Sequence, residues 1–498
     1  MFKYVHLETV QTFIANPAHA ALPRHARIQR AIRQMILDGA LTPGTPLPST
    51  RALASSLGVS RDTAEAAYAQ LHTEGFIDRR VGSGSFVSRK INFSSGRSPS
   101  LTARAALERE QTASLSRRGQ TIFASGGVRE QLMPRPFAPG VPETRTFPIS
   151  VWERLQRQVF KEFGANALHH ADPQGVAPLR RAIADYVNLE RGARAGEDRV
   201  LVLTSSQQAL SLCATVLFDP GERIFIENPV YHGARQAFEA AGLDCAPVAV
   251  DVDGIDVSQV TARPGHAKAV FLTPSHQYPT GSTLTLERRL ALIEWAASNR
   301  GWIIEDDYDS EFHYTGRPTA CVQGLDPYER TIYIGTFTKS LFPGLRLGYM
   351  ILPPQLVRPM TVARTLLDGH TAPIAQLTLA RFIEGGHFGS YVRSMRTVYA
   401  KRLRLLDTLV RRHLSGIVIP HVPQGGLQIS CLLEAPVSEQ TSIGAARAVG
   451  IDLVGISRLY ASPPVTEGWL MGFAAYTPDE IESAVCRLAA ALKTVTGA

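Results

Sequence analysis

The stretch TFTKSLFPGLRLGYM, residues 336–350, holds a lone lysine, Lys339, inside a short polar segment, with Arg346 further along. An apolar, strand-like run comes just before it. A lysine amine is a weak nucleophile at neutral pH unless its surroundings lower its pKa, and a cofactor with both an aldehyde and a phosphate needs such an amine and a nearby cation. A surface Lys/Arg pair would have the same local sequence. The neighbouring segments therefore decide between these two interpretations.

Short apolar or β-branched runs alternate with helical segments on both sides of this stretch. The runs that predict strands are residues 200–204, 223–227, 269–273, 302–305 and 331–335. This alternation predicts an α/β domain with a mostly parallel sheet. Ligands in such domains gather beyond the carboxyl ends of the strands, and polar clusters follow several of these runs.

Two of these clusters suit a phosphate and a planar ring. The first, TSSQQAL, places Ser205, Ser206 and Gln207 at a helix N-terminus directly after a strand. Backbone N–H groups, hydroxyls and the helix dipole favour a phosphate there, although a serine can also be a simple helix cap. The second, NPVYHGA, sets Tyr231 in a loop after a strand, where its ring can stack on another ring.

The segment WIIEDDYDSEF puts a run of acids straight after a buried strand, which is costly unless the charges are used. An aspartate paired with a pyridinium nitrogen uses one of them and keeps the ring an electron sink. We expect Asp306 rather than Asp307 in that role, with Tyr308 donating to the ring hydroxyl. A solvated acidic loop tip is the alternative. Pyridoxal phosphate (PLP) is the cofactor that fits the lysine, the arginine and the acid together.

The excess positive charge lies in the first quarter of the chain. Residues 1–130 hold 17 Lys or Arg against 9 Asp or Glu, so the whole net charge of +8 lies there and the rest is balanced. A local basic excess beside a neutral body is typical of a nucleic-acid-binding module, because phosphate contacts dominate such affinity. A basic solvated tail would have the same charge.

The helical pattern in this basic region predicts a helix-turn-helix. An amphipathic helix ends before Gly39, and two shorter helices follow, capped by Ser49 and Ser60 and joined by a tight turn at Gly58. In a helix-turn-helix the N-terminal end of the second helix meets the major groove of DNA. After Gly75, the pieces FIDRR and SFVSR read as a hairpin with a glycine-rich tip, which can lie along the DNA backbone.

The stretch from LTPGTPLPS through GVSRDTAEAAYAQL to GSGSFV closely resembles the winged helix-turn-helix of GntR-type transcription regulators, over roughly residues 22–88. Asp62 and Glu65 depart from it, being acidic near the reading end; they either accept hydrogen bonds from cytosine or exclude wrong sites. The resemblance implies double-stranded DNA as a partner. It implies contacts from Arg51, Ser60, Arg61, Thr63, Arg80, Gly82, Ser83 and Gly84, with Arg79 also near phosphates.

Three regions follow from these patterns. Residues 1–88 are predicted to be the winged helix-turn-helix, 89–130 a linker and 131–498 the α/β domain. The linker contains many Ser, Arg, Gly and Thr and no sustained periodicity, with a helical turn expected near residues 103–111.

The clusters of the α/β domain, in their order, resemble a fold-type I aminotransferase domain of class I/II. The resemblance implies a Schiff base between PLP and Lys339, a pyridinium partner in Asp306, and a substrate carboxylate bound by Arg458. Aminotransferases usually have Asn where this chain has Tyr278, which puts efficient transamination in doubt. The residues implied around PLP are Ser205, Ser206, Gln207, Tyr231, Tyr278, Asp306, Tyr308, Thr336, Lys339 and Arg346.

Both halves and their order resemble the MocR/GabR-type transcription regulators. The resemblance implies a homodimer that reads paired half-sites and an amino compound that displaces Lys339 to form an external aldimine, thereby changing how the DNA-binding modules are held. The alternative is an active aminotransferase with an accessory DNA-binding module. A plain DNA-binding protein whose C-terminal domain only dimerises is disfavoured by Lys339, Asp306 and Arg346.

The bulk composition adds three expectations. No run of about 18 apolar residues and no signal pattern occurs, so we expect a cytoplasmic protein. The five cysteines are odd in number and widely spaced, which indicates neither a disulfide framework nor a zinc site, and no metal is expected. The effector, the operator and the direction of regulation are not encoded in any motif.

Overall fold

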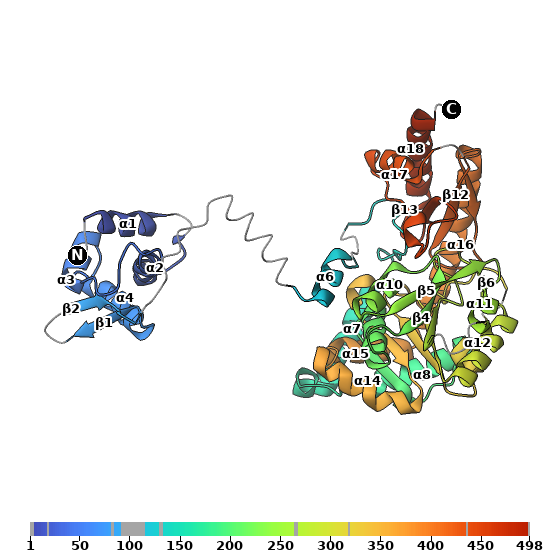
Figure 1. Ribbon diagram of the computed structural model, residues 1–498, viewed down its shortest axis with the longest axis horizontal. Coiled ribbons are helices and arrows are strands. Elements are labelled where there is room, and N and C mark those ends of the chain that lie inside the picture. Colours follow the sequence, from blue (N-terminus) through green and yellow to red (C-terminus); the bar gives the residue numbers. More distant parts are fainter. Residues whose placement is uncertain are drawn as a thin grey trace. The chain divides into compact units, whose positions relative to one another are not determined.

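The computed structural model describes residues 4–16, 19–80, 84–90, 115–128, 133–262, 267–316, 319–434 and 437–496. The chain divides into two compact units, Met1–Leu115 and Ser116–Ala498, and each has its own hydrophobic core (Figure 1). Their border lies inside the segment predicted to be a linker. Each unit is described by itself.

In the described part of unit 1, four helices carry the fold. They are α1 (Tyr4–Ala15), α2 (Arg24–Leu37), α3 (Thr50–Leu57) and α4 (Arg61–Thr73). The two predicted caps are confirmed: the hydroxyl oxygens of Ser49 and Ser60 accept hydrogen bonds from backbone N–H groups at the starts of α3 and α4, each at 3.2 Å. Gly58 ends α3 with φ 62°, a left-handed conformation that suits glycine.

A two-stranded antiparallel hairpin follows α4. Strand β1 (Ile77–Arg80) pairs along its length with β2 (Gly84–Val87), which confirms the two predicted strands of the wing. The predicted tip residues Gly82 and Ser83 lie outside the described residues. Helix α1 was not predicted, and its Val10 is fully buried in a core of unit 1 that contains Ile28, Ile32, Met35, Leu53, Tyr68 and Leu71.

The large sheet of unit 2 has the strand order β3-β10-β9-β8-β7-β4-β5-β6. Strands β5, β4, β7, β8 and β9 run parallel, whereas β10 lies antiparallel between β3 and β9. The predicted α/β class with a mostly parallel sheet is confirmed. The strands are β3 (Val200–Leu203), β4 (Arg223–Asn228), β5 (Asp244–Asp251), β6 (Gly254–Ile255), β7 (Ala269–Leu272), β8 (Trp302–Asp307), β9 (Thr331–Thr336) and β10 (Gly348–Ile351).

Helices cover both faces of this sheet because its central strands are apolar on both sides. Alternate residues of β3 show this: Val200 and Val202 join the core that includes α7, α8, α15 and α16, while Leu201 and Leu203 join the core of α9, α10 and α14. Helices α11 and α12 pack beside β5 and β7. The helices are α7 (Ile149–Phe163), α8 (Ala177–Arg191), α9 (Ser206–Val216), α10 (His232–Ala240), α11 (Val257–Thr261), α12 (Leu286–Asn299), α13 (Val322–Leu325), α14 (Pro354–Leu367), α15 (Pro373–Glu384) and α16 (His387–His413).

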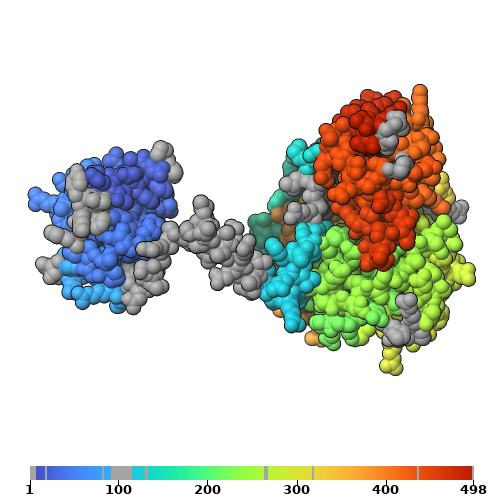
Figure 2. All heavy atoms as spheres, turned by 45° about the horizontal axis from the view of Figure 1, so that its top comes forward, coloured from blue at the N-terminus to red at the C-terminus, as the bar shows by residue number. Residues whose placement is uncertain are grey.

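A smaller antiparallel sheet, with the order β11-β12-β14-β13, forms the C-terminal part of unit 2. Figure 2 shows this part, in orange and red, lying against the part that holds the large sheet, in green. Its elements are β11 (Val418–His421), β12 (Gln428–Leu433), α17 (Glu439–Ala448), β13 (Val454–Gly455), β14 (Gly468–Gly472) and α18 (Pro478–Thr496), and short 3₁₀ turns in unit 2 are η2 (Gly164–Leu168), η3 (Glu197–Arg199), η4 (Pro343–Leu345) and η5 (Ser457–Leu459).

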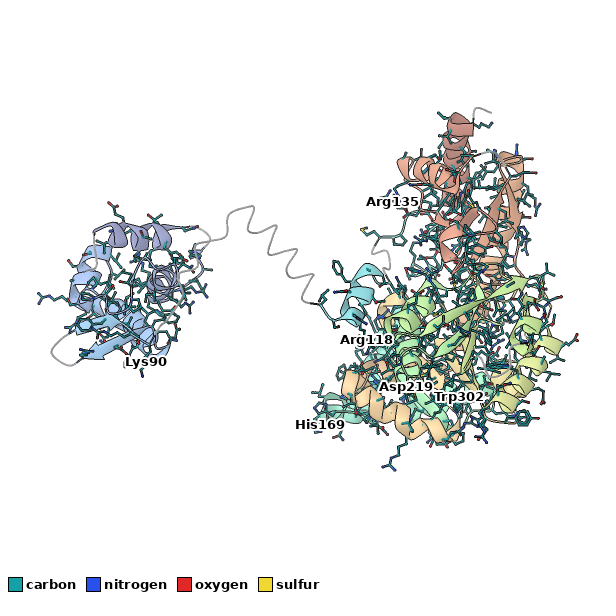
Figure 3. The ribbon with its side chains drawn as sticks, viewed as in Figure 1. Lys90, Arg118, Arg135, His169, Asp219 and Trp302 are labelled. Atoms are coloured by element: carbon teal, nitrogen blue, oxygen red, sulfur yellow. The ribbon has the colours of Figure 1, made fainter. Side chains whose placement is uncertain are left out.

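Part of the predicted linker is folded. Helix α6 (Arg117–Ala124) lies within residues 89–130 and is capped by Ser116; Figure 3 marks it by Arg118. The Gln236 side chain on α10 donates to the carbonyl of Ser125 at 2.6 Å, which holds the end of α6 against α10 within unit 2. This helix was not among the predicted elements, because its eight residues are too few to stand out by periodicity. The helical turn expected near 103–111 lies outside the described residues.

The acidic run of unit 2 belongs to the strand itself. Asp306 and Asp307 are the last two residues of β8, not the first of a loop, and they are only 4% and 5% exposed. The alternative of a solvated acidic loop tip is therefore excluded. No helix within the described residues is long and apolar enough to cross a membrane.

Candidate functional site

Strand register brings the predicted site segments to one edge of the large sheet. Gly348, at the start of β10, pairs with both Leu203 at the end of β3 and Thr336 at the end of β9. Asp307, at the end of β8, pairs with Gly335 on β9. The segments that follow β3, β8 and β9 in the chain thus start side by side at one edge of the sheet. Ligands gather at this edge in open α/β sheets.

The first of these segments forms a helix N-terminus. Ser205 caps α9, because its hydroxyl oxygen accepts the backbone N–H of Gln208 at 3.2 Å. The Gln207 amide donates to the carbonyl of Gly233 at 2.9 Å, while its own Oε1 is buried and has no hydrogen-bond partner in the described structure. Gly348 packs so closely on Ser205 that a Cβ there would lie 3.3 Å from its backbone carbon.

Three tyrosines from different loops form one aromatic row. The ring of Tyr278 meets Tyr231 edge-on at 5.6 Å between centroids and Tyr308 edge-on at 6.1 Å. The Tyr308 hydroxyl donates to the backbone carbonyl of His276 at 3.1 Å. Burial raises the pKa of Tyr278 to about 12 and that of Tyr308 well above its usual value, so both hydroxyls stay protonated donors.

The two adjacent aspartates of β8 have opposite surroundings. Asp307 accepts from the Arg191 guanidinium at 2.8 Å and from the Tyr333 hydroxyl at 2.7 Å. Burial works against ionisation of Asp307, but Arg191, Ser310 and Tyr333 outweigh it and hold its pKa below the usual value. Asp307 is therefore an ionised structural partner of Arg191.

The Asp306 side chain is held without such partners. Its Oδ1 is buried and accepts no hydrogen bond from any described residue. The Oδ1 of Asp307 shares this property, but the Oδ2 of Asp307 accepts from Arg191 and Tyr333. Burial, together with the charges of Asp307, Asp309 and Glu227, raises the pKa of Asp306 to about 7, and only Lys339 opposes the rise. A buried carboxylate of this kind is costly unless a positive donor meets it.

Lys339 lies in the loop after β9. Its Nζ donates to the carbonyl of Gly140 at 2.8 Å. Gly140 has φ 69°, and a Cβ at this position would lie 3.1 Å from the Lys339 Nζ, so glycine leaves the amine its room. Arg346 ends the 3₁₀ turn η4 with φ 51°, and Thr336 is buried at the end of β9.

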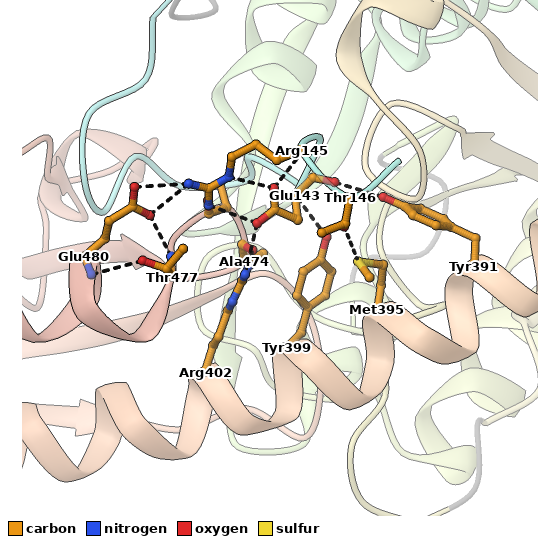
Figure 4. A network of polar contacts seen from close by, with 11 residues as sticks. Glu143, Arg145, Thr146, Tyr391, Met395, Tyr399, Arg402, Ala474, Thr477 and Glu480 are labelled. Carbon is orange, nitrogen blue, oxygen red and sulfur yellow. Dashed lines mark hydrogen bonds and ion pairs between the residues drawn. The ribbon is translucent and has the colours of Figure 1, made fainter. Parts of the chain in front are cut away.

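A polar network holds the segment that carries Gly140 (Figure 4). Glu143, 2% exposed, accepts from Arg402 on α16 at 3.0 Å and from Arg145 at 2.9 Å. Its backbone N–H donates to the Tyr399 hydroxyl at 2.8 Å, and its carbonyl accepts from the Tyr391 hydroxyl at 2.9 Å. Helix α16 thereby fixes the backbone three residues beyond the acceptor of Lys339.

Arg458 lies in the 3₁₀ turn η5 and is exposed. Glu439 anchors this turn by accepting the Ser457 hydroxyl at 2.6 Å and the Ser457 N–H at 3.0 Å. The charge of Arg458 reaches two site residues: it counteracts the burial-raised pKa of Tyr278, and it adds to burial and Arg235 in lowering the pKa of His232. The structure thus brings Arg458 within electrostatic reach of the aromatic row.

In unit 1 the predicted DNA contacts lie at the starts of two helices. Arg51 in the first turn of α3 and Arg61 at the start of α4 are exposed, and Thr63 contacts the hydroxyl of Ser60 at 2.8 Å. Arg80 lies over the Phe86 ring at 5.6 Å.

The pairing of Glu65 was not foreseen. Arg79, expected beside phosphates, forms an ion pair with Glu65 at 2.6 Å. That pair engages one of the two acids that depart from the GntR pattern, and Asp62 is the other.

Several residues around the candidate site have no signal in the sequence. Gly140 and Glu143 lie in an irregular segment, and Arg191 ends an ordinary helix. Arg364 on α14 is fully buried and donates to the carbonyl of Val202 at 2.5 Å and to Asp368 at 2.8 Å. Asp368 in turn accepts from Gln208 on α9 at 2.9 Å. Only pairing across the fold reveals these roles.

The described residues fit PLP. The partnerless, buried Oδ1 of Asp306 suits a pyridinium N–H, Lys339 supplies an amine beside it, and the capped start of α9 suits a phosphate. A winged helix-turn-helix and a fold-type I aminotransferase-like unit on one chain define a class of DNA-binding regulators that carry an enzyme-like domain. Fold-type I aminotransferases generally bind PLP.

Comparison with known proteins supports both halves of this class of regulator. Residues 140–488 match the family described as aminotransferase class I and II, and residues 24–87 match the gntR family of bacterial regulatory proteins. The probable rhizopine catabolism regulatory protein MocR of Rhizobium meliloti is 34% identical over 95% of this chain and 94% of its own length. The pyridoxine biosynthesis transcriptional regulator PdxR of Corynebacterium glutamicum is 30% identical over 94% and 96%.

The fold has a close counterpart among solved structures. Kynurenine aminotransferase of Pyrococcus horikoshii superposes with a TM-score of 0.69 and 25% identity, covering 79% of this chain and 99% of that one. The chain therefore belongs to the MocR-type family of GntR transcriptional regulators, which join a winged helix-turn-helix to an aminotransferase-like domain.

Proposed function

We propose that this chain is a PLP-dependent transcriptional regulator that senses an amino compound at Lys339. PLP, when bound, supplies an aldehyde carbon on which one amine can replace another. The observation that carries the proposal is the buried Asp306 Oδ1, which accepts no hydrogen bond from the described residues, close enough to Lys339 for their charges to interact. A buried carboxylate oxygen without a hydrogen-bond donor is costly, and a cationic ring nitrogen would supply that donor.

The surrounding residues take separate parts in this proposal. Asp306 holds the proton on the ring nitrogen, and the N-terminus of α9 with Arg346 and Thr336 binds the phosphate. Tyr308 keeps its hydroxyl proton because of its burial, so it can turn from the His276 carbonyl to the ring oxygen. Tyr231 and Tyr278 confine the ring. Arg458 binds the carboxylate of an effector that has both amine and acid groups.

Release of Lys339 is the step that can change the conformation of the protein. An effector amine that took the place of Lys339 would pass a proton to the lysine Nζ, which would become a free amine with the Gly140 carbonyl as the acceptor that it contacts in this structure. Gly140 belongs to the segment that Glu143 ties to α16, so the change reaches a long helix directly. Allosteric coupling of about 1 to 3 kcal/mol between effector and DNA would suffice for a 5- to 150-fold change in affinity.

Lys339→Ala tests the proposal. We expect the variant to fold and to bind DNA upstream of its own gene, but to lose the visible absorption of the lysine-bound cofactor and any response to amino compounds. Wild-type protein supplied with PLP and a panel of amino acids and amines is the reference. Lys493→Ala, which removes an exposed lysine on α18, is the matched control and should respond normally. An unaltered effector response in Lys339→Ala would overturn the mechanism.

A second candidate function is an active aminotransferase with an accessory DNA-binding module. The superposition on kynurenine aminotransferase favours it. Tyr278 disfavours it, since aminotransferases usually have an asparagine there whose amide tunes the ring oxygen. Turnover of an amino donor with a keto acid, without specific DNA binding, would select this alternative.

The proposal includes a homodimer, because fold-type I domains build their sites at a dimer interface. Two winged helices would then read paired half-sites on double-stranded DNA, and half-site spacing would follow the two-fold symmetry. Sedimentation of the full chain, with and without DNA, measures this directly.

A further inference from the structure

The exposed side chains of helix α16 are all cationic or hydroxyl-bearing. Its exposed residues are Ser390, Arg393, Ser394, Thr397, Lys401, Arg404, Thr408, Arg411 and Arg412. All are cations or hydroxyls, and the acid nearest this face, Asp407, is half-buried and paired with Arg411 at 2.8 Å. Other exposed helices of unit 2 are mixed in charge: α7, α8, α12 and α18 expose Glu153, Asp185, Glu287 and Glu482.

The cations of α16 form a continuous stripe. Arg393, Lys401, Arg404 and Arg412 stand at spacings of eight, three and eight residues, which places them along one side of the helix. At 1.5 Å per residue the stripe is about 28 Å long. None of the four forms an ion pair with a described residue. On the inner side, Arg396 donates to the backbone carbonyl of Glu311, and Arg402 pairs with the carboxylate of Glu143. Thr397 and Thr408 donate back to carbonyls one turn earlier, so the cations carry the charge.

We propose that this face of α16 is a second DNA-backbone surface, which contacts phosphates of the duplex outside the half-sites read by the winged helices. Arg, Lys, Ser and Thr are the side chains that proteins use on phosphate oxygens, and such contacts carry affinity without reading sequence. The charge of the stripe complements a duplex, and a helix of this length can follow the backbone over several phosphates. The inference rests on the DNA binding of the proposed function.

The Glu143 network gives this surface a link to the site. Tyr391, Tyr399 and Arg402 come from the inner side of α16 and hold the segment that carries the acceptor of Lys339 (Figure 4). The outer side of the same helix carries the cations. A change at Lys339 therefore has a direct route to the proposed DNA surface within unit 2.

The test uses full-length, PLP-loaded protein and two duplexes from upstream of its own gene: one trimmed to the two half-sites that the winged helices read, and one with long unrelated flanks. The triple variant Arg393→Gln, Lys401→Gln, Arg404→Gln removes three of the four cations of the stripe. We expect its affinity for the flanked duplex to fall at least about tenfold and the slope of log K against log salt to drop by about 2 to 3, because each phosphate contact contributes about 0.9. The trimmed duplex should be bound as by wild type.

The control triple Arg358→Gln, Arg447→Gln, Lys493→Gln removes the same charge from exposed positions on α14, α17 and α18. It should leave both duplexes unaffected, and both triples should keep the cofactor absorption that reports folding. An unchanged salt slope in the α16 triple, or an equal loss in the control, would overturn the inference while the regulator stands. Binding of α16 to phosphatidylglycerol vesicles with unchanged DNA affinity would assign the surface to a membrane and overturn it too. A wild-type chain that binds neither duplex specifically would reject the proposed function itself.

Discussion

The adjacent residues Asp306 and Asp307 have opposite electrostatic effects although both are buried. A folded pKa of about 7 for Asp306 lies above its unfolded value of about 3.9. Its contribution to stability is therefore full below about pH 4 and is lost as the pH rises through 7. The pKa of Asp307 is lowered, so its contribution is present above its unfolded pKa and is lost as the pH falls.

Asparagine at each position separates these effects. Without cofactor, Asp306→Asn should be more stable than wild type near pH 8, by about 1 kcal/mol or more, and equal to it near pH 4. Asp307→Asn should be destabilised by about 3 to 5 kcal/mol near neutral pH, because Arg191 loses its buried partner. Chemical denaturation of the apo proteins at several pH values measures both. The same pH profile for wild type and Asp306→Asn would contradict the assignment.

At the scale of elements, the Glu143 network joins an irregular segment to helix α16. Glu143→Gln leaves the buried Arg402 guanidinium without its carboxylate, so we expect a loss of about 3 to 5 kcal/mol in unfolding free energy. Glu480→Gln breaks the exposed pair of Arg145 and Glu480 and should cost about 1 kcal/mol or less. Denaturant titration compares the two. Equal losses would mean that Arg402 finds another acceptor.

The helix caps of unit 1 permit a second comparison. Ser49→Ala and Ser60→Ala each remove a capping hydroxyl and should each cost about 1 kcal/mol of stability. Only the change at Ser60, a predicted DNA contact, should also weaken operator binding. Ser60→Asp keeps a cap but places a carboxylate toward phosphates, so it should stay folded and lose DNA affinity strongly. Unchanged operator binding by Ser60→Asp would remove Ser60 from the interface.

Local patterns predict the elements well, and they fail where partners are distant in the chain. The caps at Ser49 and Ser60 and the strands around the site follow from short-range chemistry. The contact of Lys339 with Gly140 spans 199 residues, and that of Glu143 with Tyr399 spans 256. No periodicity encodes such pairings. The sequence predicts Asp306 and Asp307 directly after a buried strand, whereas β8 continues through both residues. Their burial becomes understandable only with Arg191, Tyr333 and a cationic ring.

For the whole molecule, the two separate cores predict two unfolding transitions in calorimetry of the full chain. PLP should raise the midpoint temperature of the unit 2 transition only. At 100 times its dissociation constant it should add about 2.7 kcal/mol to the unfolding free energy of that unit. Operator DNA should raise the transition of unit 1. Lys339→Ala should reduce the PLP shift and leave the DNA shift in place. A single transition that both ligands move together would show that the units fold as one body.

Helix α6 shortens the connection between the DNA-binding unit and the aminotransferase-like unit. Because α6 is folded and Gln236 holds the chain at Ser125, unit 2 begins at Ser116 instead of the predicted residue 131, which shortens the connection between the units by residues 116–130. At about 3.5 Å per residue this removes roughly 50 Å of contour length. A shorter connection raises the effective concentration of the second module once the first has bound DNA, so α6 increases the avidity of the two modules together. Substitutions that detach it would tune the reach of the regulator without altering a single contact with DNA or cofactor.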